Sequence, residues 1–262
     1  MPRMWPCERL STIDSTQREV LRRLSGPGAQ SGGPFGLWTT AQTQGIASHG
    51  RRWVDSPDGL ACSLGWPEAL CPLGIESAWP VRLSLITIQV LEHCFPGVRG
   101  RIGVKWPNDM MVGDKKLGGV LVSRHHVNGA WWLVAGIGVN LAWPTVPELD
   151  RPVTALIDLG VRDLMPENIV AGLSTAIAQV CSVSAQTNYV DGLTEEFRRR
   201  DIYADQSVVV VHPVSGEALA RGINRGCSAN GSLQLEVDGM VRSISVGELS
   251  LRPAPIIPLE SR

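Results

Sequence analysis

The three lysines of this chain have the clearest chemical potential, because all of them lie between positions 105 and 116. They belong to the segment 105–122, which reads KWPNDMMVGDKKLGGVLV. A Pro-Asn-Asp stretch favours a turn after Lys105, and the turn signal at Gly113–Asp114 predicts a hairpin that returns Lys115 and Lys116 toward it. Ammonium groups gathered beside Asp109 would suit a phosphate and its Mg²⁺. An ordinary charged hairpin is the alternative interpretation.

Two other segments have residue types suited to binding. Residues 40–53, TAQTQGIASHGRRW, read as a loop in which backbone N–H groups and Arg51 or Arg52 would bind a phosphate, unless this is a surface loop with a basic end. Residues 134–140, VAGIGVN, read as an apolar strand whose glycines let a flat ligand approach, although a tight strand exit explains them equally well. The third glycine and the helix of a dinucleotide fingerprint are absent, which excludes a Rossmann site.

Hydrophobic periodicity predicts the elements that must position these segments. The predicted helices cover residues 15–24, 78–94, 166–180 and 189–200. The predicted strands cover residues 37–42, 60–66, 102–106, 117–122 and 131–137. This mixed order differs from the regular alternation of a doubly wound fold.

The pattern changes near Asp205 to short runs of period two, separated by turn residues. These runs are residues 207–212, 218–224, 232–237 and 241–245. They predict a small antiparallel barrel of about fifty residues, a size at which independent folding is marginal. We therefore expect two domains, residues 1–204 and residues 205–262.

Composition limits the class of protein. The 262 residues suit one large domain, with or without a small appendage. The 24 Lys and Arg balance 25 Asp and Glu, whereas a protein that coats nucleic acid should be basic. No apolar run reaches 18 residues, which argues against a membrane span, and the N-terminus lacks the apolar core of a secretory signal. The six cysteines are scattered without zinc spacing, so we expect reduced thiols, no metal site built by a protein cluster, and a cytoplasmic location.

Taken together and in order, the motifs resemble the biotin–protein ligase family over roughly residues 10–253. The resemblance rests on Ser15-Thr16-Gln17, Gln42 with the glycines and basic residues of the following loop, KWPND, KKLGGVL, GIGVN and the ending 247–252, GELSLR. It implies a mixed α/β sheet with flanking helices, similar to class II aminoacyl-tRNA synthetases, followed by an SH3-like β-barrel. It also implies an enzyme that joins biotin to ATP with Mg²⁺ and passes the biotin to a lysine. The motifs begin at residue 15, so the ligase-only form, without an N-terminal DNA-binding domain, is expected.

The resemblance also implies site residues. The biotin-binding set is Ser15, Thr16, Gln17, Gln42, Ile46, Ala47, Ser48 and Lys116. The set that binds ATP or the adenylate is Gly45, Gly50, Arg51, Trp53, Asn108, Gly119, Gly136, Gly138, Asn140, Glu248 and Arg252. The catalytic set is Lys116, Lys105, Arg51 and Asp109, with Mg²⁺ expected near Asp109.

The loop after Gly45 departs from the family pattern Gly-Arg-Gly-Arg-x-Gly. Ile46 and Ser48 stand where two guanidiniums would close over the adenylate, and His49 replaces them only when protonated. Losing one charge-assisted contact lowers the binding free energy of the adenylate by about 1.5–3 kcal/mol. We expect a working ligase with a leaky adenylate; a ligase for another acyl group and a decayed enzyme are the other outcomes.

The expected acceptor is the biotin carboxyl carrier domain of acetyl-CoA carboxylase or a similar carboxylase. A homodimer is also an expectation, whereas a nucleic acid or membrane partner is not. Two other functions are alternatives: a lipoate or octanoyl ligase or transferase of the same superfamily, and a non-catalytic sensor that binds biotin or its adenylate.

Overall fold

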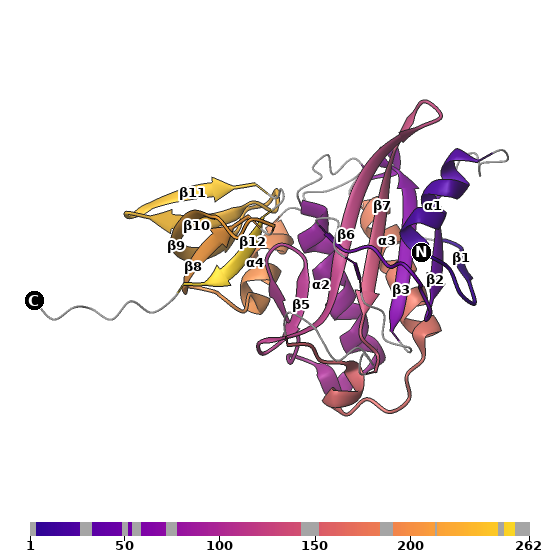
Figure 1. Ribbon diagram of the computed structural model, residues 1–262, viewed down its shortest axis with the longest axis horizontal. Helices are drawn as coiled ribbons and strands as arrows, with labels where there is room; N and C mark the ends of the chain where they lie inside the picture. The colour runs from indigo at the N-terminus through magenta and orange to yellow at the C-terminus, as the bar shows by residue number, and fades with distance from the viewer. Residues whose placement is uncertain are drawn as a thin grey trace, which may run out of the picture.

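A mixed seven-stranded sheet forms the larger part of the molecule (Figure 1). The computed structural model describes residues 4–26, 33–48, 52–53, 59–71, 78–142, 152–183, 191–212, 214–245 and 249–254. The strands, in chain order, are β1 (Cys7–Arg9), β2 (Phe35–Thr39), β3 (Leu60–Pro67), β4 (Gly103–Lys105), β5 (Asp109–Val112), β6 (Lys115–Val127) and β7 (Ala130–Val139). Their spatial order is β1-β2-β3-β7-β6-β5-β4, and β1 pairs with β2 in parallel while the other neighbours are antiparallel.

A second, five-stranded antiparallel sheet ends the chain. Its strands are β8 (Ser207–Val211), β9 (Ala218–Cys227), β10 (Leu233–Val237), β11 (Met240–Ile244) and β12 (Ser250–Pro253), in the order β11-β10-β9-β8-β12. The four strands expected here are present, and β12 was missed by the sequence analysis. We call this unit the C-terminal sheet; its independence as a domain and its SH3-like character stay predictions.

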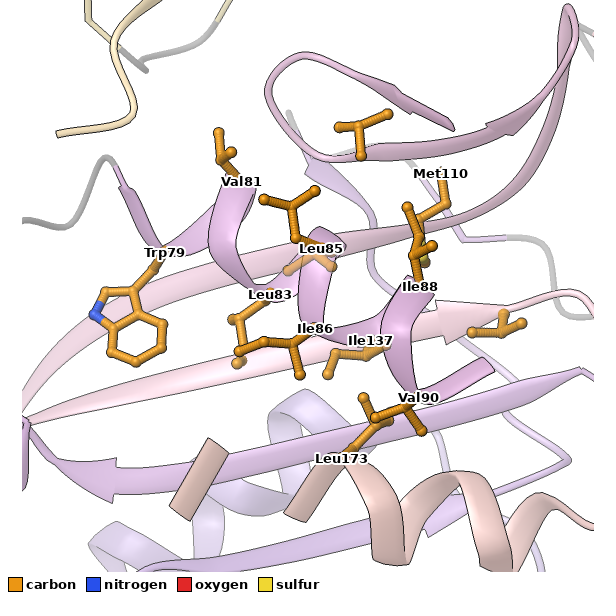
Figure 2. Packing of buried hydrophobic residues seen from close by; sticks show 14 of the residues in the cluster. Trp79, Val81, Leu83, Leu85, Ile86, Ile88, Val90, Met110, Ile137 and Leu173 are labelled. Atoms are coloured by element: carbon orange, nitrogen blue, oxygen red, sulfur yellow. The ribbon is translucent and has the colours of Figure 1, made fainter. Parts of the chain in front are cut away.

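Helices cover the two faces of the large sheet. They are α1 (Thr16–Ser25), α2 (Ala78–Cys94), α3 (Pro166–Val183) and α4 (Asp191–Arg200), and short 3-10 turns lie at Glu68–Leu70, Pro96–Val98 and Leu156–Leu159. The main core gathers α2 and α3 against one face, where Leu83, Ile88 and Val90 pack near Ile137 and Leu173 (Figure 2). A smaller core lies under α1, formed by Val20, Leu24, Phe35, Leu37, Trp132 and Val134. Because neighbouring residues of β7 divide between the two cores, α1 lies on the face opposite α2 and α3.

The structure corrects several predicted boundaries. The strand expected over 37–42 ends at Thr39, because residues 41–44 leave the sheet and hydrogen-bond along Ile13 and Asp14. β6 and β7 are longer than predicted and are joined by a tight turn at Asn128–Gly129, where both residues have positive φ. β1 and β5 were missed since strands of three or four residues show too little periodicity.

The connection 201–206 joins the two sheets. Ile202 N donates to Val104 O over 3.1 Å, and Asn224 Nδ2 of β9 donates to Asp201 Oδ2 over 2.7 Å. Burial raises the pKa of Asp201 to about 6. The boundary expected near Asp205 falls in this connection.

Membrane-spanning helices and clusters of metal-binding side chains are both absent from the described residues. None of the helices in the described ranges is long and apolar enough to cross a membrane. Over the same ranges, three or more His, Cys, Asp or Glu side chains do not gather in a way that would hold a metal ion.

Candidate active site

The N-terminus of α1 presents two hydroxyl side chains to a cavity. Ser15 is the N-cap, and its Oγ accepts a hydrogen bond from Arg18 N at 3.4 Å, which satisfies one of the free N–H groups of the first turn. Because residues 41–44 run alongside Ile13 and Asp14, Gln42 reaches the same helix end. Gln42 Oε1 accepts hydrogen bonds from Thr16 N at 2.8 Å and from Thr16 Oγ1 at 3.2 Å.

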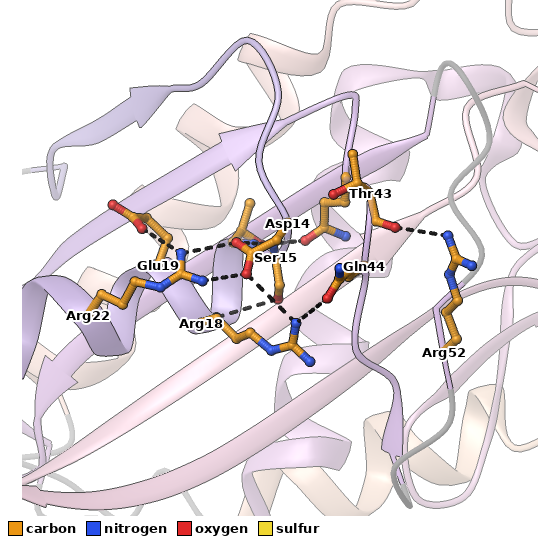
Figure 3. Close-up of polar contacts among 10 residues, drawn as sticks. Asp14, Ser15, Arg18, Glu19, Arg22, Thr43, Gln44 and Arg52 are labelled. Atoms are coloured by element: carbon orange, nitrogen blue, oxygen red, sulfur yellow. Dashed lines mark hydrogen bonds and ion pairs between the residues drawn. The ribbon is translucent and has the colours of Figure 1, made fainter.

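Ion pairs hold this helix end from the outside, as Figure 3 shows. Arg22 bridges Asp14 and Glu19, and Arg18 Nη1 donates to Gln44 Oε1 over 3.0 Å. The hydrogen bond from Arg22 lowers the pKa of Asp14. These exposed contacts add little stability each, but they connect α1 to the segment that carries Gln42.

A buried polar chain supports Thr16 from below. Thr16 Oγ1 lies 2.8 Å from Ser63 Oγ, which donates to Gln17 Oε1 over 3.2 Å. Gln17 Nε2 then donates to Ser123 Oγ at 3.0 Å and to Val134 O at 3.1 Å. Because Ser63 gives its one proton to Gln17, the single Thr16 proton is shared between Ser63 Oγ and Gln42 Oε1, and the Thr16 oxygen keeps its lone pairs for a ligand N–H.

Ser63 was missed by the sequence analysis. A serine in the otherwise apolar strand LACSLGW was the available signal, because alternation places it on the same face of β3 as Ala61. Gln17, predicted to bind biotin, has both ends of its carboxamide engaged inside the protein. The structure therefore gives Gln17 the position of a support for Ser63 and Thr16.

A cluster of two lysines and one carboxylate lies beside these polar groups. The predicted turn is confirmed, since β4 pairs with β5 across it and β5 pairs with β6 across Gly113–Asp114. Lys105 Nζ lies 3.3 Å from Asp109 Oδ2, and Lys116 Nζ contacts Asp109 Oδ1. All three side chains are at most 16% exposed. The cluster has a formal charge of +1 in a poorly solvated place, which suits an anion.

Asn108 fixes the turn between β4 and β5. Its Nδ2 donates to Val120 O over 2.7 Å, and its carbonyl accepts from Val120 N at 3.1 Å. Lys115, which was also predicted to return toward Lys105, is instead exposed on the hairpin and lies outside the cluster. The segment 105–122 thus separates its lysines by strand alternation, with Lys116 directed inward and Lys115 outward.

Decreasing side-chain size along the sheet creates the cavity. On the α1 face, β7 presents Trp132, Val134, Gly136 and Gly138 in succession, so a packed core gives way to open space. A Cβ on Gly136 would lie 2.7 Å from Gln17 Oε1, and a Cβ on Gly138 would lie 2.5 Å from the Trp53 ring. The glycines predicted to admit adenine therefore make room for side chains of this chain.

The loop after Gln42 closes over the cavity. Ile46 forms an antiparallel bridge with Arg52, and Trp53 N donates to Gly45 O over 2.9 Å. Arg52 also donates to Thr43 O at 2.8 Å (Figure 3). These contacts place the Trp53 ring 5.8 Å from Lys116 Nζ, so the indole lies between Gly138 and the lysine cluster.

Most of the predicted site residues meet in one cavity. The predicted residues that line it are Ser15, Thr16, Gln17, Gln42, Ile46, Ala47, Ser48, Trp53, Asn108, Lys116, Gly119, Gly136 and Gly138. The lining residues that the sequence analysis missed are Ala61, Cys62, Ser63, Val120, Leu121 and Ile137. Lys105 and Asp109 join the cavity through Lys116, and Gly45 through Trp53.

Five other predicted residues have different outcomes. Asn140 is buried behind Lys116, and its Nδ2 donates to Thr154 O at 2.9 Å and to Lys116 O at 3.3 Å. Arg252 is exposed on β12 and pairs across to Val209. Gly50, Arg51 and Glu248 lie outside the described residues, as does His49. The nucleotide contacts of all these residues stay predictions.

Comparison with known proteins identifies relatives of the chain. Residues 11–140 match the model of the biotin/lipoate A/B protein ligase family. The bifunctional ligase/repressor BirA of Salmonella typhimurium is 29% identical over 254 residues, covering 94% of this chain and 74% of BirA. The biotin–[acetyl-CoA-carboxylase] ligase of Mycobacterium tuberculosis is 27% identical, covering 90% of this chain and 85% of that protein.

A solved structure confirms the fold. The biotin protein ligase from Aquifex aeolicus, in complex with biotin and ATP, has a TM-score of 0.78 and 22% identity, covering 95% of this chain and 99% of that one. The predicted mixed α/β class is therefore confirmed. Together, the family model and the relatives that align with at least 90% of this chain show that it belongs to the biotin/lipoate A/B protein ligase family.

Proposed function

We propose that this chain joins biotin to ATP, forms biotinyl-5′-adenylate, and transfers the biotin to a lysine of a carrier protein. The observation that carries this proposal is one cavity with two chemically different halves. Neutral hydrogen-bonding groups at the start of α1 form one half, and the Lys105–Asp109–Lys116 cluster borders the other. The Mycobacterium tuberculosis relative, a biotin–[acetyl-CoA-carboxylase] ligase, supports the same assignment.

The neutral half suits the ureido ring of biotin, whose N–H and C=O groups need fixed polar partners. Thr16 Oγ1 is held by Gln42 and Ser63 so that it can accept from a ring N–H. Gln42 Oε1 is committed to Thr16, which turns the donor end of its carboxamide toward other partners. The apolar side chains of Ile46 and Leu121 would cover the rest of the bicyclic ring.

The charged half suits the first chemical step. The biotin carboxylate attacks the α-phosphorus of ATP, the bond to the β-phosphate oxygen breaks, and pyrophosphate leaves. Lys116 Nζ would stabilise the negative charge shared by carboxylate and α-phosphate, and Lys105 would hold the departing phosphates. Asp109 keeps both ammonium groups at fixed positions before the nucleotide arrives.

Magnesium enters this scheme as part of the substrate MgATP. Both Asp109 oxygens face lysine ammonium groups, an arrangement that suits phosphate oxygens better than a cation. We therefore assign the metal to the phosphate oxygens of ATP and not to Asp109.

The second step needs an amine and little further catalysis. The ε-amine of the carrier lysine attacks the acyl carbon of the adenylate. The bond from this carbon to the phosphate oxygen breaks, AMP leaves, and the amine loses one proton as the amide forms. Because the mixed anhydride is already a good electrophile, positioning of the amine dominates this step. The acceptor class is a biotin carboxyl carrier domain of acetyl-CoA carboxylase or a similar carboxylase.

An octanoyl transferase that uses a thiol is the weaker alternative. Cys62 is among the lining residues, but its thiol is fully buried, and burial raises its pKa well above the usual range. A thiol in that state is a poor nucleophile. The following experiment distinguishes the proposed function from a ligase for lipoate or octanoate and from a non-catalytic sensor.

The test is ATP–pyrophosphate exchange with biotin, lipoate or octanoate as the only acid. We expect exchange with biotin alone, because the neutral half matches a ureido ring. Exchange with another acid would assign a different acyl substrate, and absence of exchange with all three would favour the sensor.

A further inference from the structure

The turn that carries the lysine cluster is also held by the C-terminal sheet. Trp106, between Lys105 and Pro107, is fully buried, and its Nε1 donates a hydrogen bond to Gly231 O over 2.9 Å. Gly231 lies between β9 and β10, 125 positions away in the sequence. This bond therefore connects the C-terminal sheet directly to the residue next to Lys105.

The acceptor side of this bond is well ordered. Gly231 N donates to Ser228 O over 2.8 Å, and Ser228 N donates to Ser232 O over 2.8 Å, so the hairpin loop is closed by its own hydrogen bonds. Gly231 has a φ of 78°, a conformation that side chains rarely adopt. A carbonyl in such a loop has a fixed direction.

The donor, Trp106, belongs to the turn that positions the lysine cluster. Asn108 ties one end of the turn to Val120 of β6, whereas Trp106 ties the other end to the C-terminal sheet. The separation between Lys105 Nζ and Asp109 Oδ2 depends on the shape of the turn between these two anchors. Loss of either anchor would let the ammonium groups drift from the positions that phosphates require.

We propose that Trp106 is a positioning residue for MgATP, through which the Gly231 carbonyl of the C-terminal sheet sets the geometry of the Lys105–Asp109–Lys116 cluster. This inference rests on the proposed function. It makes the C-terminal sheet a participant in adenylate formation, while the biotin half of the cavity is held by α1, β3 and the segment that carries Gln42, with Gln17 anchored on β6 and β7.

The test compares two matched tryptophan substitutions in the full chain. Trp106→Phe removes the hydrogen bond and part of a ring. Trp66→Phe removes the same atoms from another fully buried tryptophan, whose Nε1 has no hydrogen-bond partner among the residues that the structure describes. The dissociation constants of MgATP and of biotin are measured by calorimetry, alongside the melting temperature and the exchange rate.

We expect Trp106→Phe to weaken MgATP binding about five- to tenfold and to change biotin binding less than about twofold. Trp66→Phe should leave the ratio of the two constants unchanged, whatever it does to the melting temperature. Equal effects of both substitutions on MgATP binding, or no effect of Trp106→Phe, would overturn the proposal.

A second variant approaches the same bond from the other side. Gly231→Ala strains the loop and shifts the carbonyl while the indole stays intact. It should also weaken MgATP binding alone, and the double variant should be no worse than the stronger single one, because both changes remove one interaction. Additive losses would contradict the proposal. If Trp106→Phe does not fold, the result for Gly231→Ala alone decides. A wild-type chain that binds both ligands without exchange would reject the proposed function and leave the variant comparison valid.

Discussion

The two halves of the cavity are built in different ways. The half at the start of α1 is a network of neutral groups, in which Thr16, Gln42, Ser63 and Gln17 are joined by hydrogen bonds. The other half is a charged cluster in which two lysines share Asp109. The neutral half is held by local packing of α1 on β3, whereas the charged half depends on a hairpin, a loop and the C-terminal sheet.

This difference indicates to which change each half is sensitive. A neutral network fixes the direction of each donor and acceptor, so removal of one hydroxyl leaves a buried partner unsatisfied. The charged cluster attracts phosphates over longer distances, but only while the hairpin and the C-terminal sheet hold its ammonium groups at fixed positions. Ile46 and Ser48, which depart from the pattern that the resemblance implies, line this cavity. We expect the departure to affect retention of the adenylate more than recognition of biotin.

The largest expected effect comes from Lys116→Ala. Removal of this ammonium should lower the biotin-dependent exchange rate about 10²–10³-fold, as loss of a group that stabilises transition-state charge does. The matched control is Lys115→Ala, because Lys115 is the exposed neighbour on the same strand. Equal losses in the two variants would show that the charged half has been assigned to the wrong residue.

Thr16→Val tests the neutral half. The change keeps the shape of the side chain but leaves Ser63 and Gln42 without the Thr16 hydroxyl, so biotin affinity should fall about 10- to 100-fold. The KM for MgATP should change less than about twofold, since the hydrogen bonds of Thr16 go to Gln42 and Ser63 and bypass the lysine cluster.

A suitable control is Thr87→Val, because Thr87 is a buried threonine bonded to Leu83 O within α2, at 2.7 Å. If both variants lost biotin affinity equally, a general loss of stability would explain the result and the neutral half would lose its assignment.

Ser48→Arg tests the departure of the loop from its family. A guanidinium at this position would reach over the cavity and add one charge-assisted contact to the adenylate. We expect release of biotinyl-adenylate to slow about tenfold or more, with biotin affinity little changed. Release rates are measured by rapid filtration after loading. A variant that loses biotin affinity instead would place Ser48 in the neutral half.

Ionic strength should separate the halves without mutation. Raising salt from about 0.05 M to about 0.5 M should raise the KM for MgATP severalfold, because screening weakens attraction to the lysine cluster. The dissociation constant of biotin should change less than about twofold. Comparable shifts in both constants would mean that charge contributes to biotin binding as well.

Local patterns predicted much of this architecture. The helix over residues 78–94 was predicted at its observed bounds, because its apolar spacing is continuous. The turn after Lys105 was also predicted, since proline and glycine fix backbone conformations locally. The resemblance to a known family supplied Gln42, whose position next to Thr16 depends on a segment that leaves the sheet after Thr39.

Contacts between distant segments were not predictable in the same way. Ser63 carries no local signal of its bond to Thr16, which requires the packing of α1 on β3. The roles of Gly136 and Gly138 changed for the same reason, because the side chains they accommodate come from α1 and from the loop at Trp53. The bond from Trp106 to Gly231 joins two sheets and appears only when both are placed.

The most direct test of the account is mass spectrometry of the products formed when the purified chain is mixed with MgATP and one acid. With biotin, the account predicts a mass equal to biotinyl-5′-adenylate, much of it free in solution because the loop lacks the two arginines. With lipoate it predicts no adenylate. Formation of lipoyl-adenylate in preference to the biotin product, or of no adenylate from either acid, would contradict the assignment of the two halves.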